Sequence, residues 1–204
     1  MKRRLQMGKV KRVKDAVCVA LGAVYKNEFR LIQQQCHELN IVGAFYHYFR
    51  SMFERDFESY SIDMEYSRMG ERKMSKSISV SAEKRKCSYC HEKHSRRVRS
   101  DFIIHKPGTD DNLVVIEFKG EWSKGCFAWD KKKLQELTKP LSSRSDTDDY
   151  VCGYQLGVSI VLNNQRVVMS FYPDNNDNAN LNSEEISKDE LIDRYESYLS
   201  RSVE

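Results

Sequence analysis

The spacing of apolar side chains predicts helices near both ends of the chain. Across residues 29–57, apolar residues recur every three or four positions, which is the period of one face of an α-helix. This stretch predicts one long helix, which could be interrupted at Asn40 or Gly43. A shorter helix is predicted before it, across Val13–Tyr25, and an amphipathic helix over residues 184–200 is predicted to end the chain.

Strands are predicted where the pattern changes to a period of two or to a continuous apolar run. The predicted strands are Ser59–Tyr66, Val98–His105, Leu113–Lys119, Tyr154–Leu162 and Gln165–Tyr172. The run LVVIEFK predicts a central strand covered on both faces, because it is apolar almost throughout. A turn over residues 106–112 makes a hairpin of the second and third strands, and Asn163-Asn164 joins the last two.

One further helix is predicted between the third and fourth strands, over Asp130–Lys139 with Asp130 as its N-cap. The resulting order of elements is typical of an α/β fold with a central mixed β-sheet flanked by helices. A chain of 204 residues is expected to form a single domain, 1–204, and residues 70–97 are expected to be a polar, basic insertion.

The composition bears on where the protein is located in the cell. No apolar window approaches the length of about 18 residues that a membrane span needs, and the start of the chain does not resemble a secretory signal. Six unevenly spaced cysteines do not form a disulfide framework. We therefore expect a reduced, cytoplasmic protein with no membrane partner.

Positive charge is concentrated in two segments. Residues 1–14 hold seven Lys or Arg and no acid, and residues 84–99 are rich in Lys and Arg with a single Glu, although the net charge is only +4. Such segments suit a polyanion such as DNA, and a solvated face is the alternative. The candidate nucleic-acid-binding residues are Arg68, Arg96, Arg97, Lys131 and Lys132.

The predicted hairpin carries a candidate site. Glu117 and Lys119 lie two apart on one strand, so they share one face, and Asp101 lies early on the neighbouring strand. Two carboxylates can bind a hard cation such as Mg²⁺, or Mn²⁺ in its place, with the backbone carbonyl of Phe118 as a further oxygen ligand. The cation would polarise a phosphoryl oxygen and acidify a water, and Lys119 would hold or deprotonate that water. The alternative is an Asp and a Glu–Lys pair on the surface of an edge strand.

Asp101, followed after fifteen residues by Glu117-Phe118-Lys119, resembles the PD-(D/E)XK nuclease superfamily of restriction, recombination and repair nucleases. The resemblance implies a restriction-endonuclease-like fold over residues 28–172. It also implies that an acidic residue on a preceding helix, best matched by Glu38, joins the metal site. Ser100 replaces the family's proline.

Other residues leave alternatives open. Cys87, Cys90, His91 and His94 have the spacing of zinc ligands, and a basic loop with free thiols is the alternative. Asp63 and Glu65 face the same way on the first predicted strand. Glu65 could add to the carboxylate site, and a solvent-facing pair with an ion-paired Arg is the alternative. The aromatic residues that follow the third strand could stack on bases or pack in the core; they are Trp122, Phe127 and Trp129.

Three functions follow from these patterns. The first is a Mg²⁺-dependent nuclease that hydrolyses DNA phosphodiester bonds, with endonuclease action favoured, acting alone, as a homodimer or within a larger nuclease complex. The second is a non-catalytic nucleic-acid-binding module on the same fold. The third is a protein-interaction component of a defence or mobile-element system.

Overall fold

The computed structural model describes residues 2–66, 68–69, 74–75, 98–143, 152–172 and 183–202. Its helices are α1 (Lys2–Asn27), α2 (Phe29–Gln33), α3 (Glu38–Phe53), α4 (Phe127–Leu137) and α5 (Lys188–Arg201), with short 3₁₀ turns at Arg55–Phe57 and Leu141–Ser143. Its strands are β1 (Ser61–Tyr66), β2 (Arg68–Met69), β3 (Met74–Ser75), β4 (Ser100–His105), β5 (Asn112–Gly120), β6 (Leu156–Leu162), β7 (Arg166–Tyr172) and β8 (Ser183–Ser187).

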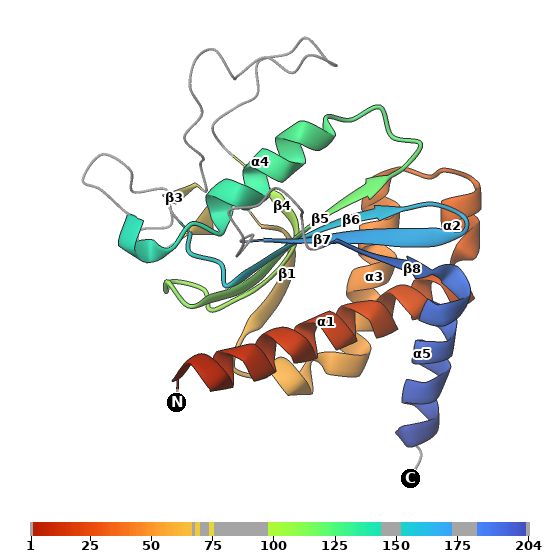
Figure 1. Ribbon diagram of the computed structural model, residues 1–204, viewed down its shortest axis with the longest axis horizontal. Helices are drawn as coiled ribbons and strands as arrows, with labels where there is room; N and C mark the ends of the chain where they lie inside the picture. The colour runs from red at the N-terminus through yellow and green to blue at the C-terminus, as the bar shows by residue number, and fades with distance from the viewer. Residues whose placement is uncertain are drawn as a thin grey trace.

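Six strands form one open sheet in the order β1-β4-β5-β6-β7-β8, and β2 and β3 form a separate small ribbon (Figure 1). Only β5 and β6 run parallel, because α4 crosses between them, and the other neighbours in the large sheet are antiparallel. The prediction of an α/β fold with a central mixed sheet is therefore confirmed. The apolar run of β5 lies between β4 and β6 and not at an edge, as its sequence predicts.

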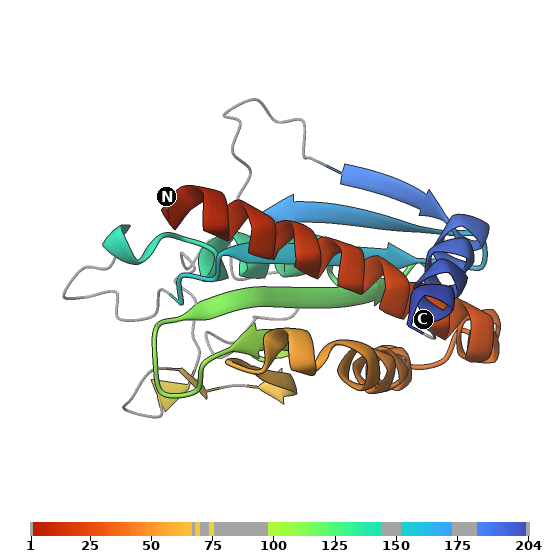
Figure 2. The ribbon, with the colours of Figure 1, turned by 90° about the horizontal axis from the view of Figure 1, so that it is seen from below.

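The helices are divided unequally between the two faces of the sheet. α1, α3 and α5 cover one face, and α4 covers the other (Figures 1 and 2). The first face holds the main core, in which Phe45 of α3 contacts Phe102 of β4 and Phe118 of β5. The second face holds a smaller core, formed by Leu134 and Leu137 of α4 together with Ile103, Val115 and Tyr154.

The prediction of one continuous helix over residues 29–57 is wrong. The chain forms α2, leaves the helical path, and begins α3 at Glu38. Gln35 has a φ of 51°, a left-handed conformation that ends a helical turn. This break places Glu38 in the first turn of α3. Asn40 and Gly43 both lie within α3 and do not interrupt it.

Three other boundaries differ from the sequence-based prediction. α4 begins at Phe127, so Asp130 lies in its first turn and Cys126 is the N-cap residue. The segment Ser183–Ser187, expected as loop and helix start, forms β8 against β7, and α5 follows at Lys188. α1 is longer than the predicted helix, because its basic N-terminal residues continue the helix beyond the buried part. Within the described residues, no helix is both long and apolar enough to cross a membrane.

Candidate active site beneath helix α4

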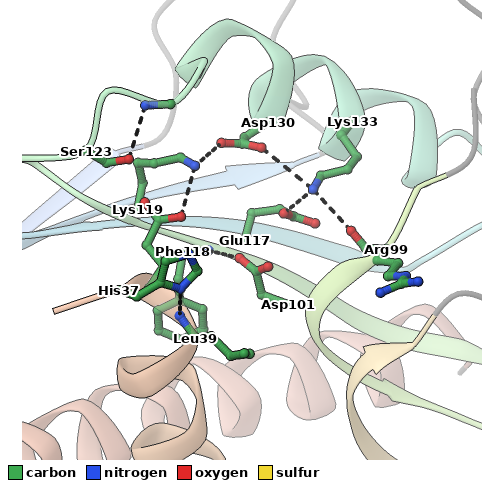
Figure 3. Close-up of polar contacts among 12 residues, drawn as sticks. His37, Leu39, Arg99, Asp101, Glu117, Phe118, Lys119, Ser123, Asp130 and Lys133 are labelled. Atoms are coloured by element: carbon green, nitrogen blue, oxygen red, sulfur yellow. Dashed lines mark hydrogen bonds and ion pairs between the residues drawn. The ribbon is translucent and has the colours of Figure 1, made fainter. Parts of the chain in front are cut away.

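The carboxylates and lysines of the candidate site lie on the face of the sheet that α4 covers. Ile116 and Phe118 point into the main core, so Glu117 and Lys119 point the other way, because successive side chains of a strand alternate. Asp101 shares the face of Ile103, which belongs to the smaller core. The three predicted residues therefore come together beneath α4 (Figure 3).

Strands β4 and β5 part at the site, and Asp101 fills the gap. Their pairing runs to Phe102 opposite Ile116 and stops there. Beyond that point, the Oδ2 atom of Asp101 accepts a hydrogen bond from the backbone N–H of Phe118 at 2.7 Å. The carboxylate takes the place of a strand partner and is held against the residue between Glu117 and Lys119.

This hydrogen bond also orients the backbone of Phe118. In a strand, the N–H and C=O of one residue point toward the same neighbouring strand. Since the N–H of Phe118 points toward Asp101, its carbonyl oxygen faces the same gap between β4 and β5. The carbonyl expected as a metal ligand therefore lies on the side of Asp101.

Lys119 lies between two carboxylates from different helices. Its Nζ atom is 3.2 Å from Oε2 of Glu38 and 3.2 Å from Oδ2 of Asp130. A Cβ at Gly125 would lie 2.8 Å from this Nζ, so glycine leaves room for the ammonium group. Burial lowers the pKa of Lys119, but the charges of Asp130 and Glu38 outweigh burial and hold the pKa above its usual value. Lys119 is therefore charged and suited to donate hydrogen bonds, which favours the role of holding a water or phosphate over that of a base.

A second lysine, Lys133, enters the site from α4. Its ammonium forms an ion pair with Oε2 of Glu117, lies 3.6 Å from Oδ1 of Asp130, and donates to the backbone carbonyl of Arg99 at 3.2 Å. Its side chain is 10% exposed and that of Glu117 is 3% exposed. Burial lowers the pKa of Lys133, but Glu117, Asp130 and Asp101 together raise it above its usual value.

Sequence reasoning missed the roles of Asp130 and Lys133. From the sequence, Asp130 is expected to be a helix cap, and Lys133 is one of three consecutive lysines at the start of that helix that could contact phosphate. The signal was the spacing of three residues between Asp130 and Lys133, which puts both side chains on one helical face. The direction of that face depends on how α4 packs on β5 and β6, and this packing is a tertiary feature.

Burial raises the pKa of two carboxyl groups of the site, those of Asp101 and Glu117. It raises the pKa of Asp101 to about 6, against the opposing effects of Lys133 and the Phe118 N–H. Burial raises the pKa of Glu117 well above its usual value, and the charges of Asp101 and Asp130 add to this, while Lys133 opposes it. Among the described residues, Oε1 of Glu117 and Oε1 of Glu38 are buried and find no hydrogen-bond partner. Both oxygens are therefore free to accept a ligand.

The site has more carboxylates than cations. Within the part of the chain that the structure describes, Lys119 and Lys133 are the cations that pair with Glu38, Glu117 and Asp130. With Asp101 included, the six groups carry an excess of two negative charges when all are ionised. A divalent cation would balance that excess, and the free Oε1 of Glu117 is an oxygen ligand of the kind that Mg²⁺ takes. Among the described residues, however, no three His, Cys, Asp or Glu side chains are grouped closely enough to hold a metal ion by themselves. A bound ion would need backbone oxygen and water as further ligands.

The other predicted residues lie outside this cluster or outside the described part of the chain. Lys131 is exposed on α4, and Lys132 pairs with Glu136. Arg68 lies in β2, opposite Ser75. Arg96, Arg97 and the candidate zinc ligands Cys87, Cys90, His91 and His94 lie outside the described residues.

Both acidic residues on β1 have polar partners of their own. Asp63 contacts the buried His105 at 2.9 Å, and Glu65 lies 3.7 Å from Arg99. Of the aromatic residues after β5, Phe127 is 43% exposed, Trp129 packs on the smaller core and Trp122 on the main core. Core packing therefore describes the two tryptophans better than it describes Phe127.

Comparison of the chain with family models, with curated proteins and with solved structures gives no match.

Proposed function

We propose that the chain is a Mg²⁺-dependent nuclease that hydrolyses DNA phosphodiester bonds, with endonuclease action and a restriction-endonuclease-like arrangement. One observation carries the proposal. Asp101, Glu117, Lys119 and Glu38 come from three separate segments and meet at the point where β4 and β5 part. Mn²⁺ could replace Mg²⁺, and the protein would act in the cytoplasm, alone, as a homodimer or in a larger complex.

Each residue has a role in this proposal. Asp101, the free oxygen of Glu117 and the carbonyl of Phe118 would hold the metal, with Glu38 beside them. When bound, Mg²⁺ would supply Lewis-acid polarisation of a phosphoryl oxygen and an acidified water. Lys119, kept charged by Glu38 and Asp130, would bind the scissile phosphate and stabilise the charge that develops on it. Lys133 would hold the other oxygen of Glu117 and so orient its free oxygen.

The test is cleavage of plasmid and linear DNA in Mg²⁺, Mn²⁺ or EDTA by the wild type, Asp101→Ala and Lys119→Ala. We expect cleavage that needs the metal, and a loss of about 100-fold or more in each variant. Lys26→Ala and Asp193→Ala are matched controls, because both residues lie on helices that cover the opposite face and both are exposed. A wild type that cuts no faster than Asp101→Ala and Lys119→Ala contradicts the proposal.

Two alternatives remain as outcomes of this experiment. Salt-dependent DNA binding without metal-dependent cleavage would identify a non-catalytic nucleic-acid-binding module. Absence of DNA binding would favour a protein-interaction component of a defence or mobile-element system. Zinc is a separate question, which metal analysis of the wild type and Cys87→Ser answers.

A further inference from the structure

A groove of about 440 Å³ opens at the end of β5, just beyond Lys119. The described residues that line it are Gln35, Glu121, Trp122, Asn163, Asn164 and Gln165. They include one aromatic ring, four side-chain amides and one carboxylate, but no Lys or Arg. This lining suits an uncharged planar ligand with hydrogen-bond donors and acceptors better than it suits a phosphate.

Some of the residues that line the groove are neighbours in sequence of two residues of the candidate active site. Glu121 and Trp122 follow Lys119 on the same strand end, and Gln35 precedes Glu38, the partner of Lys119, by three residues. The backbone N–H of Glu121 donates to the carbonyl of Leu162 at 2.9 Å, which holds the β6–β7 turn beside them. The groove therefore lies at the same end of β5 as Lys119.

The β6–β7 turn presents free amides to the groove. Asn163 builds the turn: its Oδ1 accepts from the backbone N–H groups of Gln165 and Arg166 at 2.8 and 2.9 Å. Its Nδ2 donates to Glu121. The side-chain amides of Asn164, Gln165 and Gln35 have no hydrogen-bond partner among the described residues. Each can offer a donor and an acceptor in one plane, which is how Asn and Gln bind the edge of a base.

Trp122 supplies a flat surface in the same groove. Three atoms of its indole ring lie no farther than 2.8 Å from the position that a Cβ would take at Gly120. The ring therefore lies flat on Gly120, which only glycine permits. Trp122 packs partly on the main core, and it also lines the groove, so part of its ring is available to a ligand there.

We propose that this groove binds an unpaired nucleobase of a DNA strand whose phosphate lies at Lys119. The inference rests on the proposed nuclease function and makes it more specific, because a base can stack on Trp122 and meet the amides only when it is unpaired. Base–aromatic stacking is tolerant of sequence, whereas the amides select among base edges. The substrate would then be single-stranded DNA or a duplex with an unpaired segment near the cut.

Tryptophan fluorescence tests the groove without requiring cleavage. The chain has only two tryptophans, so Trp129→Phe leaves Trp122 as the single reporter. The probe is a DNA single strand of about 10 nucleotides, compared in EDTA with strands that lack one base at each position in turn. We expect the full strand to quench Trp122 and one abasic position to abolish most of the quenching. Gln165→Ala should weaken binding by about 5-fold or more, since a well-placed amide–base pair contributes that much.

Gln135→Ala is the matched control, because Gln135 is an exposed amide on α4 outside the groove. Equal quenching by all abasic strands, or equal affinity of Gln165→Ala and Gln135→Ala, overturns the base site. If Trp129→Phe does not fold, anisotropy of labelled strands on the unmodified chain gives the same comparison. DNA cleavage without base-dependent binding would contradict the base site and leave the nuclease proposal standing. Base-dependent binding without metal-dependent cleavage would support the base site and contradict the nuclease proposal.

Discussion

The two faces of the sheet differ in what they bury: one is almost entirely apolar, and the other holds charged side chains. One face lies under α1, α3 and α5 (Figure 2). It is filled by apolar and aromatic side chains, and Phe45 contacts both Phe102 and Phe118. The face under α4 combines a small apolar core with buried carboxylates and lysines (Figure 3). Burying a charge is costly unless it is paired, and on the second face Lys119 and Lys133 are both paired with carboxylates.

The largest expected effect on stability comes from breaking the buried ion pair between Lys133 and Glu117. Lys133→Met leaves Glu117 without its cation, and we expect a loss of about 3–5 kcal/mol in the free energy of unfolding. The double variant Lys133→Met with Glu117→Leu should recover most of that loss, because an apolar pair of similar volume needs no charge partner. Urea unfolding measures both. Lys131→Met, an exposed lysine on the same helix, is the control, and an equal effect of the two single substitutions would contradict the role of the pair.

A smaller effect, of opposite sign, is expected at Asp101. The pKa of Asp101 is raised from 3.8 to about 6 in the folded protein, chiefly by burial. A carboxyl with a raised pKa contributes stability below its unfolded pKa and loses it as the pH rises through the folded value, here between about 4 and 6. Asp101→Asn avoids the buried charge and keeps an oxygen for the Phe118 N–H.

We therefore expect Asp101→Asn to stabilise the metal-free protein by about 1–3 kcal/mol near pH 8 and by close to nothing near pH 3.5. Urea unfolding in EDTA at both pH values measures this. Added Mg²⁺ should stabilise the wild type more than the variant, because the variant lacks a charged ligand. A stability change that is the same at both pH values would show that burial of the carboxylate is not its cause.

The smallest effect is expected for an ion pair in solvent. Arg166 on β7 and Glu185 on β8 pair at 2.8 Å, with side chains 45% and 56% exposed. Arg166→Ala should cost about 1 kcal/mol or less, and the effect should shrink in high salt. Thermal unfolding at low and high salt checks both points. A cost near that of Lys133→Met would mean that burial is not what separates the two kinds of pair.

The sequence predicted the strands, and the shared placement of Asp101, Glu117 and Lys119, better than it predicted the helices and their contacts. β1, β4, β5, β6 and β7 follow from the alternating and apolar patterns, and Asp101, Glu117 and Lys119 were placed together by counting along one hairpin. That hairpin is local, so its geometry follows from strand periodicity and a short turn. The break at Gln35 was missed, because apolar spacing continues across a left-handed residue without a visible change.

The sequence by itself determined that this chain forms a mixed α/β sheet with two carboxylates and a lysine on one hairpin. Periodicity sets which side chains share a face, and this holds whatever packs above them. Only the tertiary structure decided that α4 places Asp130 and Lys133 over those residues, and that Lys119 lies between two helices and stays charged. These features depend on contacts between segments that are distant in the chain, and their strength depends on burial, which no local pattern encodes.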